Sequence, residues 1–135
     1  MSAIPIHDSL IYIMVTMSMV DRKMSNLELS RIGDIIKSLP VFAKFDENRL
    51  TEVSKTCGEI LQDEENLSTI LNIAAELPEN LYETAYALAV EVAAADLHVE
   101  QEELRFLQLL RNKLALDKLV TAALERGARA RHQSV

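Results

Sequence analysis

Glycine and proline are scarce in this chain. Only three of each occur among 135 residues, and no segment alternates apolar and polar residues over the length of a strand. Sheets joined by tight turns need these residues often, whereas here apolar side chains recur every three or four positions, as on one face of a helix. We therefore predict an all-α fold, a compact bundle of about seven helices.

The apolar content predicts a single helical domain. Apolar residues make up 49% of the chain, but aromatic residues make up only 4% and tryptophan is absent. A chain of this length supports one core, which Leu, Ile, Val, Ala and Met must fill. We place the domain at 1–126 and expect the basic residues 127–135, with Arg129 and Arg131, to form a flexible tail.

Capping signals and prolines divide the domain into helices. Ser25 and Glu28 form a capping-box pattern, Asp46 is a second candidate cap, and Pro40 and Pro78 are stop signals. The expected helices are 7–20, 25–39, 46–61, 67–77, 79–96, 100–115 and 117–126.

Charge and cysteine content exclude several classes of function. The net charge of −7 opposes nucleic-acid binding, because affinity for phosphates comes from clustered Lys and Arg. Cys57 is the only cysteine, so the chain has no internal disulfide and suits a reducing compartment. No basic leader precedes an apolar stretch, and Leu10–Val20 is too short to span a bilayer. We expect a cytoplasmic protein that is not itself a membrane protein.

An internal repeat carries the candidate site. Sliding the chain against itself by 75 positions aligns two helix-turn-helix units, 8–39 and 83–114. In each unit an apolar helix ends at an aspartate, and seven positions later a glutamate precedes a leucine. The paired acids are Asp21 with Asp96, and Glu28 with Glu103.

These acids have two interpretations. An anion at a helix C-terminus opposes the macrodipole by about 0.3 to 1 kcal/mol, so each aspartate needs compensation. Either the aspartates accept backbone N–H groups in the turns while the glutamates close capping boxes, or the four acids converge on a divalent cation. Calcium, magnesium and zinc are the candidates, and oxygen ligands suit the first two. An EF-hand is excluded, since its loop needs twelve positions and a central glycine.

The order and spacing of these motifs resemble the tellurite-resistance TerB family. The resemblance covers most of the chain and rests on three segments: Val20–Leu29, Phe42–Asp46 and Ala94–Leu104. It implies an all-helical cytosolic protein of a bacterial stress response, with an acidic metal-binding surface and membrane-associated partners. It places the acids of the family on Asp21, Glu28, Asp96 and Glu103. The family usually has glycine after each aspartate, where this chain has Arg22 and Leu97.

No catalytic motif occurs in the sequence. It has no nucleophile elbow, glycine-rich phosphate loop, HExxH helix or Cys-His constellation, so we expect a protein that is not an enzyme. The first hypothesis is a metal-responsive binding module with protein partners. The alternative is a metal-free interaction or oligomerisation domain, such as a homodimer, in which the acids are turn caps. Replacing Asp21 and Asp96 by asparagine abolishes cation-dependent stabilisation only under the first.

Overall fold

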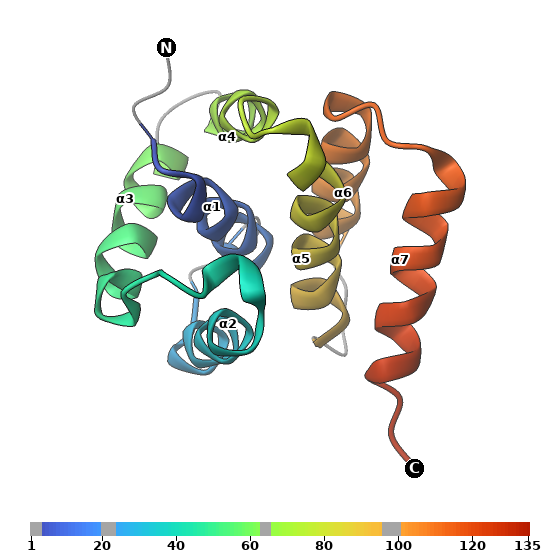
Figure 1. The fold of residues 1–135 in the computed structure, drawn as a ribbon, viewed down its shortest axis with the longest axis horizontal. Helices are drawn as coiled ribbons and strands as arrows, with labels where there is room; N and C mark the ends of the chain where they lie inside the picture. The colour runs from blue at the N-terminus through green and yellow to red at the C-terminus, as the bar shows by residue number, and fades with distance from the viewer. Residues whose placement is uncertain (1–3, 20–23, 63–65, 96–100) are drawn as a thin grey trace.

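The computed structural model describes residues 4–19, 24–62, 66–95 and 101–135 (Figure 1). These ranges hold seven α-helices, three short 3-10 helices and no strand, so the predicted all-α fold is confirmed. The α-helices are α1 (Ile6–Met19), α2 (Asn26–Ser38), α3 (Leu50–Gln62), α4 (Asn66–Ala75), α5 (Tyr82–Ala95), α6 (Gln101–Lys113) and α7 (Lys118–Arg131). The 3-10 helices are η1 (Pro40–Phe42), η2 (Glu47–Arg49) and η3 (Glu79–Leu81).

Helix α1 is the centre of the bundle. Every side chain from Asp8 to Ser18 is buried, as expected for a helix that is apolar on nearly all sides. It packs against α3 and α5, and also contacts α2, α4 and α6. Figure 1 shows α1 between α3 and α5, with α7 on the far side of α5. Residues 10–18 of the apolar segment that was too short to span a bilayer therefore lie in the core.

The predicted caps start the second and third helices. The Ser25 Oγ accepts a hydrogen bond from the Glu28 backbone N–H at 3.1 Å, and the Glu28 Oε1 accepts one from the Ser25 N–H at 2.8 Å. This reciprocal pair confirms the capping box. The Asp46 Oδ1 accepts from the Asn48 N–H at 3.0 Å, so Asp46 caps η2, which leads into α3.

The C-terminal helix is longer than the sequence indicated. We expected it to end at Arg126, before a flexible tail at 127–135, but α7 continues to Arg131. Ala128 is buried against the bundle. Beyond it, the Glu91 carboxylate of α5 accepts from Arg131 at 2.5 Å and lies 2.6 Å from the His132 Nε2. These long-range contacts, which the local sequence does not show, hold the last turn in place.

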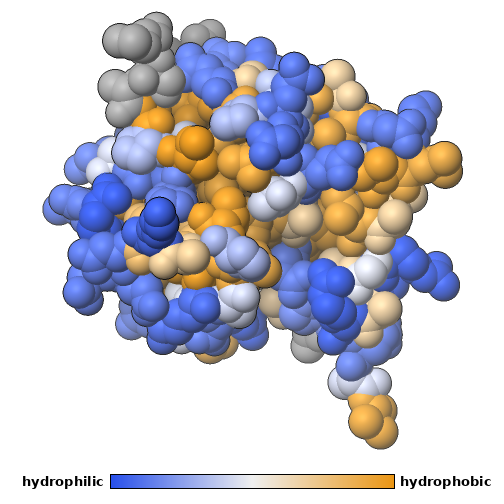
Figure 2. All heavy atoms as spheres, viewed as in Figure 1, coloured by the Kyte–Doolittle hydropathy of each residue, from blue (hydrophilic) through white to orange (hydrophobic). Residues whose placement is uncertain are grey.

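Exposed apolar side chains come from several helices. Figure 2 shows apolar side chains across the middle and right of this face, with hydrophilic side chains around them. The large apolar side chains that are exposed, such as Leu27, Leu104 and Leu119, are on three different helices; scattered residues of this kind are normal on a protein surface. None of the helices in the described ranges is long and apolar enough to cross a bilayer.

Each candidate repeat unit contributes two helices to the bundle: α1 and α2 lie in the first unit, and α5 and α6 lie in the second. The repeat itself stays a prediction.

Candidate functional site

The four predicted site residues divide into two pairs. Asp21 and Asp96 lie outside the described residues. Glu28 and Glu103 are each the third residue of their helix, α2 and α6 respectively. A carboxylate in the first turn of a helix is favoured by the macrodipole. Each glutamate therefore has a helix-stabilising role whether or not it binds a ligand.

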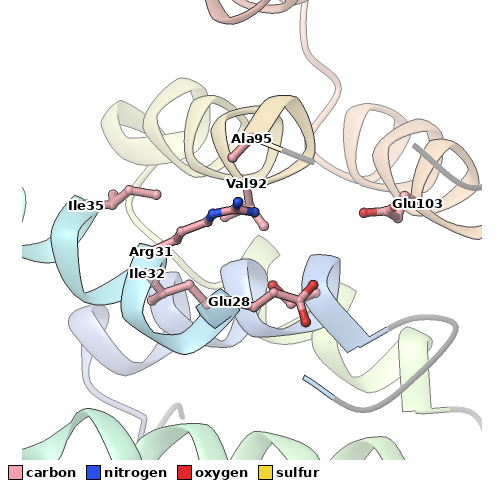
Figure 3. Close-up of a pocket in the computed structure, with 8 residues that line it drawn as sticks. Glu28, Arg31, Ile32, Ile35, Val92, Ala95 and Glu103 are labelled. Atoms are coloured by element: carbon pink, nitrogen blue, oxygen red, sulfur yellow. The ribbon is translucent and has the colours of Figure 1, made fainter. Parts of the chain in front are cut away.

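The fold brings Glu28 and Glu103 to the same cavity (Figure 3). The cavity has a volume of about 20 Å³, enough for one water molecule. It lies where the ends of four helices meet: α1 and α5 end there, and α2 and α6 begin there. The lining residues are Ser18, Glu28, Arg31, Ile32, Ile35, Val92, Ala95 and Glu103.

The two glutamates differ in burial. Glu103 is only 4% exposed, whereas Glu28 is half-buried and already uses its Oε1 in the capping box. Charges interact more strongly where little water competes. A cation in the cavity would therefore interact more strongly with Glu103 than with Glu28.

Ser18 places a buried hydroxyl on the cavity wall. Ser18 is 3% exposed, and its Oγ has no hydrogen-bond partner in the part of the chain that the structure describes. Thr16, two residues earlier, donates to the Tyr12 carbonyl at 2.7 Å, so the helix satisfies one hydroxyl and not the other. A buried polar group without a partner is unfavourable by about 1 to 3 kcal/mol. Ser18 therefore has capacity for a ligand in the cavity.

Arg31 brings a positive charge to the same cavity. Figure 3 shows its guanidinium and the Glu103 carboxylate pointing toward one another from α2 and α6. Arg31 makes no ion pair within 4.0 Å among the described residues. Neither Arg31 nor Ser18 was predicted from the sequence. Arg31 is three residues after Glu28, and this spacing puts two side chains on the same helix face, so its proximity to Glu28 could have been predicted.

Among the described residues, the side chains lining the cavity that could bind a metal are two carboxylates and one hydroxyl, with no cysteine or histidine. Oxygen ligands suit calcium and magnesium better than zinc, which usually binds nitrogen and sulfur. Among the described residues, no three His, Cys, Asp or Glu side chains lie close enough together to hold a metal. Any cation here would take further ligands from water or from residues beyond the described ranges.

The other polar clusters tie helices together. The Tyr86 hydroxyl donates to the Glu125 Oε2 at 2.5 Å and accepts from Arg111 at 2.7 Å, which links α5, α6 and α7. Burial, together with the hydrogen bond to Glu125, raises the pKa of Tyr86 to about 12. Burial likewise raises the pKa of the Cys57 thiol to about 12, so the thiolate form that attacks substrates or binds metals is disfavoured.

Comparison with protein-family models, with curated proteins and with solved structures finds no match for this chain. The resemblance to the TerB family therefore stays a prediction from the residues quoted above. The cavity between α1, α2, α5 and α6 is the feature on which a functional interpretation depends.

Proposed function

We propose that this chain is a TerB-like binding module of a bacterial stress response, located in the cytoplasm, whose contact with protein partners depends on a divalent cation. One observation supports this proposal more strongly than any other. Glu28 and Glu103, which the sequence paired at an offset of 75 positions, line a single cavity together with the buried hydroxyl of Ser18.

Calcium and magnesium fit the chemistry of this cavity. Both are hard cations that prefer carboxylate, hydroxyl, carbonyl and water oxygens. Glu28, Ser18 and Glu103 would supply three oxygen ligands, and waters would complete the shell. Asp21 and Asp96 are the further candidates from the sequence, and Ala95, the residue before Asp96, lines the cavity.

A cation here would change how α2 is held. In the described part of the chain, α2 packs chiefly on α1 and on the turns η1 and η2. A ligand shared by Glu28 and Glu103 would tie the start of α2 to the start of α6. The other half of α2 borders a groove of about 400 Å³, where Ile35 and Leu39 face Leu88 of α5. Restricting the movement of α2 would therefore change the shape of this groove, which is open to a partner.

Thermal unfolding of metal-stripped protein with calcium, magnesium, zinc and manganese tests the proposal. A ligand that binds only the native state stabilises it by RT ln(1 + [L]/Kd), about 2.7 kcal/mol at a hundredfold excess over Kd. We expect a saturable rise in the melting temperature with calcium or magnesium. Replacing Asp21 and Asp96 by asparagine removes it, as does the double variant Glu28→Gln with Glu103→Gln.

The glutamine variants are a controlled change. A glutamine at 28 keeps an oxygen acceptor for the Ser25 N–H, so the capping box survives. The matched control is Glu59→Gln with Glu76→Gln, which removes two negative charges from exposed positions on α3 and after α4. A rise that persists in the cavity variant, or no rise with any of the four ions, contradicts the proposal.

Arg31 favours a second candidate function, the metal-free interaction or oligomerisation domain. Its guanidinium already brings a positive charge to the cavity, and an internal cation can neutralise part of the carboxylate charge without a metal. Under this alternative the glutamates are helix caps. Dimer formation that persists in chelator, with wild-type melting of the Asp21→Asn and Asp96→Asn double variant, supports it.

A further inference from the structure

We propose that the outer face of α7 binds an acidic surface on a second copy of this chain, so that copies associate head to tail. The outer face lies opposite the buried Thr121 and Ala128. It comprises the exposed residues Lys118, Leu119, Ala122, Ala123, Arg126 and Arg129. None of them lines the cavity of Glu28 and Glu103, so the inference does not depend on the proposed function.

The outer face is basic and uncovered. Helix α7 packs chiefly on α5 and lies at the edge of the bundle (Figure 1). Its cations Lys118, Arg126 and Arg129 make no ion pair within 4.0 Å among the described residues. Arg131 lies on another side of the helix and is paired with Glu91. Three positive charges of the outer face are therefore available to the carboxylates of a partner.

The complementary charge is on the same chain. Residues 56–104 include twelve Asp and Glu but no Lys or Arg, whereas residues 105–135 include seven Lys and Arg and two acids. Within the acidic stretch, Glu76, Glu79 and Glu83 are exposed around η3. They also make no ion pair within 4.0 Å among the described residues. Every copy therefore offers both an unpaired basic surface and an unpaired acidic one.

Charge also decides how two copies meet. Two outer faces of α7 repel one another, so a two-fold contact between equivalent surfaces is disfavoured. Contact between the basic surface of one copy and the acidic surface of the next is heterologous, and it leaves both kinds of surface open at the ends of the assembly. An anionic membrane fits less well, because Leu119 is the one large apolar residue of the outer face and the net charge of −7 repels anionic lipids.

Sedimentation velocity at rising protein concentration, in chelator and low salt, measures the association. The mass of wild type should rise above the monomer value of 15.2 kDa and return to it in about 1 M salt, where the Debye length is about 3 Å. Arg126→Glu with Arg129→Glu should weaken association at least about tenfold, because like charges then meet. Lys44→Glu with Lys55→Glu gives the same net charge from exposed positions elsewhere and should associate far more strongly than the α7 variant.

A complementary variant identifies the acidic surface. Glu79→Lys with Glu83→Lys removes that surface and keeps α7, whereas the α7 variant keeps the acidic surface. Each variant alone should be mainly monomeric. An equimolar mixture should form a complex of two chains and nothing larger, because each variant supplies the one surface that the other lacks. Formation of this complex also shows that both variants are folded.

Several results would overturn the inference. They are a wild type that stays monomeric at low salt, an α7 variant that associates as the Lys44 and Lys55 control does, and a mixture that stays monomeric. Vesicles of phosphatidylcholine and phosphatidylserine test the membrane instead. A monomeric wild type that binds them, with binding lost in the α7 variant, assigns the outer face to lipid and overturns contact between copies. Since chelator is present throughout, these results leave the cation site untouched.

Discussion

Replacing Ser18 by alanine should stabilise the protein while weakening its cation response. The Ser18 hydroxyl is buried and has no hydrogen-bond partner among the described residues. Its removal abolishes a desolvation penalty of about 1 to 3 kcal/mol. Alanine is also a better helix former than serine by up to about 0.5 kcal/mol. The loss of one small atom from the packing reduces this gain in stability by a few tenths of a kcal/mol.

The net expectation is a gain of about 1 kcal/mol in the free energy of unfolding. For a domain of this size that corresponds to a rise of roughly 4 °C in melting temperature. Urea unfolding monitored by circular dichroism gives the free energy, and a melt in chelator gives the temperature. Under the proposed function the same variant shows a smaller calcium- or magnesium-dependent rise than wild type, because the ion loses one oxygen ligand.

Ser54 provides a matched control. It is also a buried helical serine whose Oγ has no partner in the described residues, but it lies on α3 and does not line the cavity. Ser54→Ala should stabilise the protein to a similar extent and keep the full cation response. Destabilisation of both variants refutes the reasoning, because it shows that the hydroxyls are satisfied. Equal cation responses in both variants remove Ser18 from the site.

Three further predictions concern the contacts that hold the helices. Tyr86→Phe should lower stability by about 1.5 kcal/mol through loss of two hydrogen bonds to charged partners. Since the folded pKa of Tyr86 is about 12 and therefore raised, wild type also loses stability as the pH rises from 10 to 12, and this alkaline loss should shrink in the variant. Burial opposes the charge of Glu91, but hydrogen bonds from Arg131 and His132 lower its pKa. Acid unfolding should therefore remove this contribution as the pH falls below about 4.5, and Glu91→Gln should flatten that dependence and speed amide exchange in the last turn of α7. Ser25→Ala should cost about 1 kcal/mol in urea unfolding through loss of the cap, and an unchanged midpoint contradicts that role.

The helices were predicted well because the residues that start and end them act on neighbouring positions in the sequence. The capping box at Ser25 and the stop at Pro40 act within one turn of the chain, and both are found as expected. The predicted end of α7 was wrong, because the last turn of the helix is held by contacts with Glu91, about 40 residues earlier in the chain. A basic, glycine-containing segment appears frayed when such a partner is not known.

The candidate site was only partly predictable. The repeat offset selected Glu28 and Glu103, and the fold places both on one cavity. Ser18 was not selected, since a serine in an apolar helix shows its lack of a partner only when neighbouring helices are in place. The spacing of Arg31 from Glu28 indicates a shared helix face, but it does not indicate that this face meets α6. Sequence therefore indicates which acids meet, and packing decides what lies between them.

Paramagnetic broadening by manganese tests the central claim most directly, because it locates the ion. Manganese, which shares the oxygen preference of magnesium, is titrated in trace amounts into isotope-labelled protein while amide NMR signals are recorded. The account predicts that signals of Ser18, Glu28 and Glu103 broaden first, and that the Glu28→Gln and Glu103→Gln double variant loses this pattern. Broadening that is absent, or that centres on acidic residues far from this cavity, contradicts it.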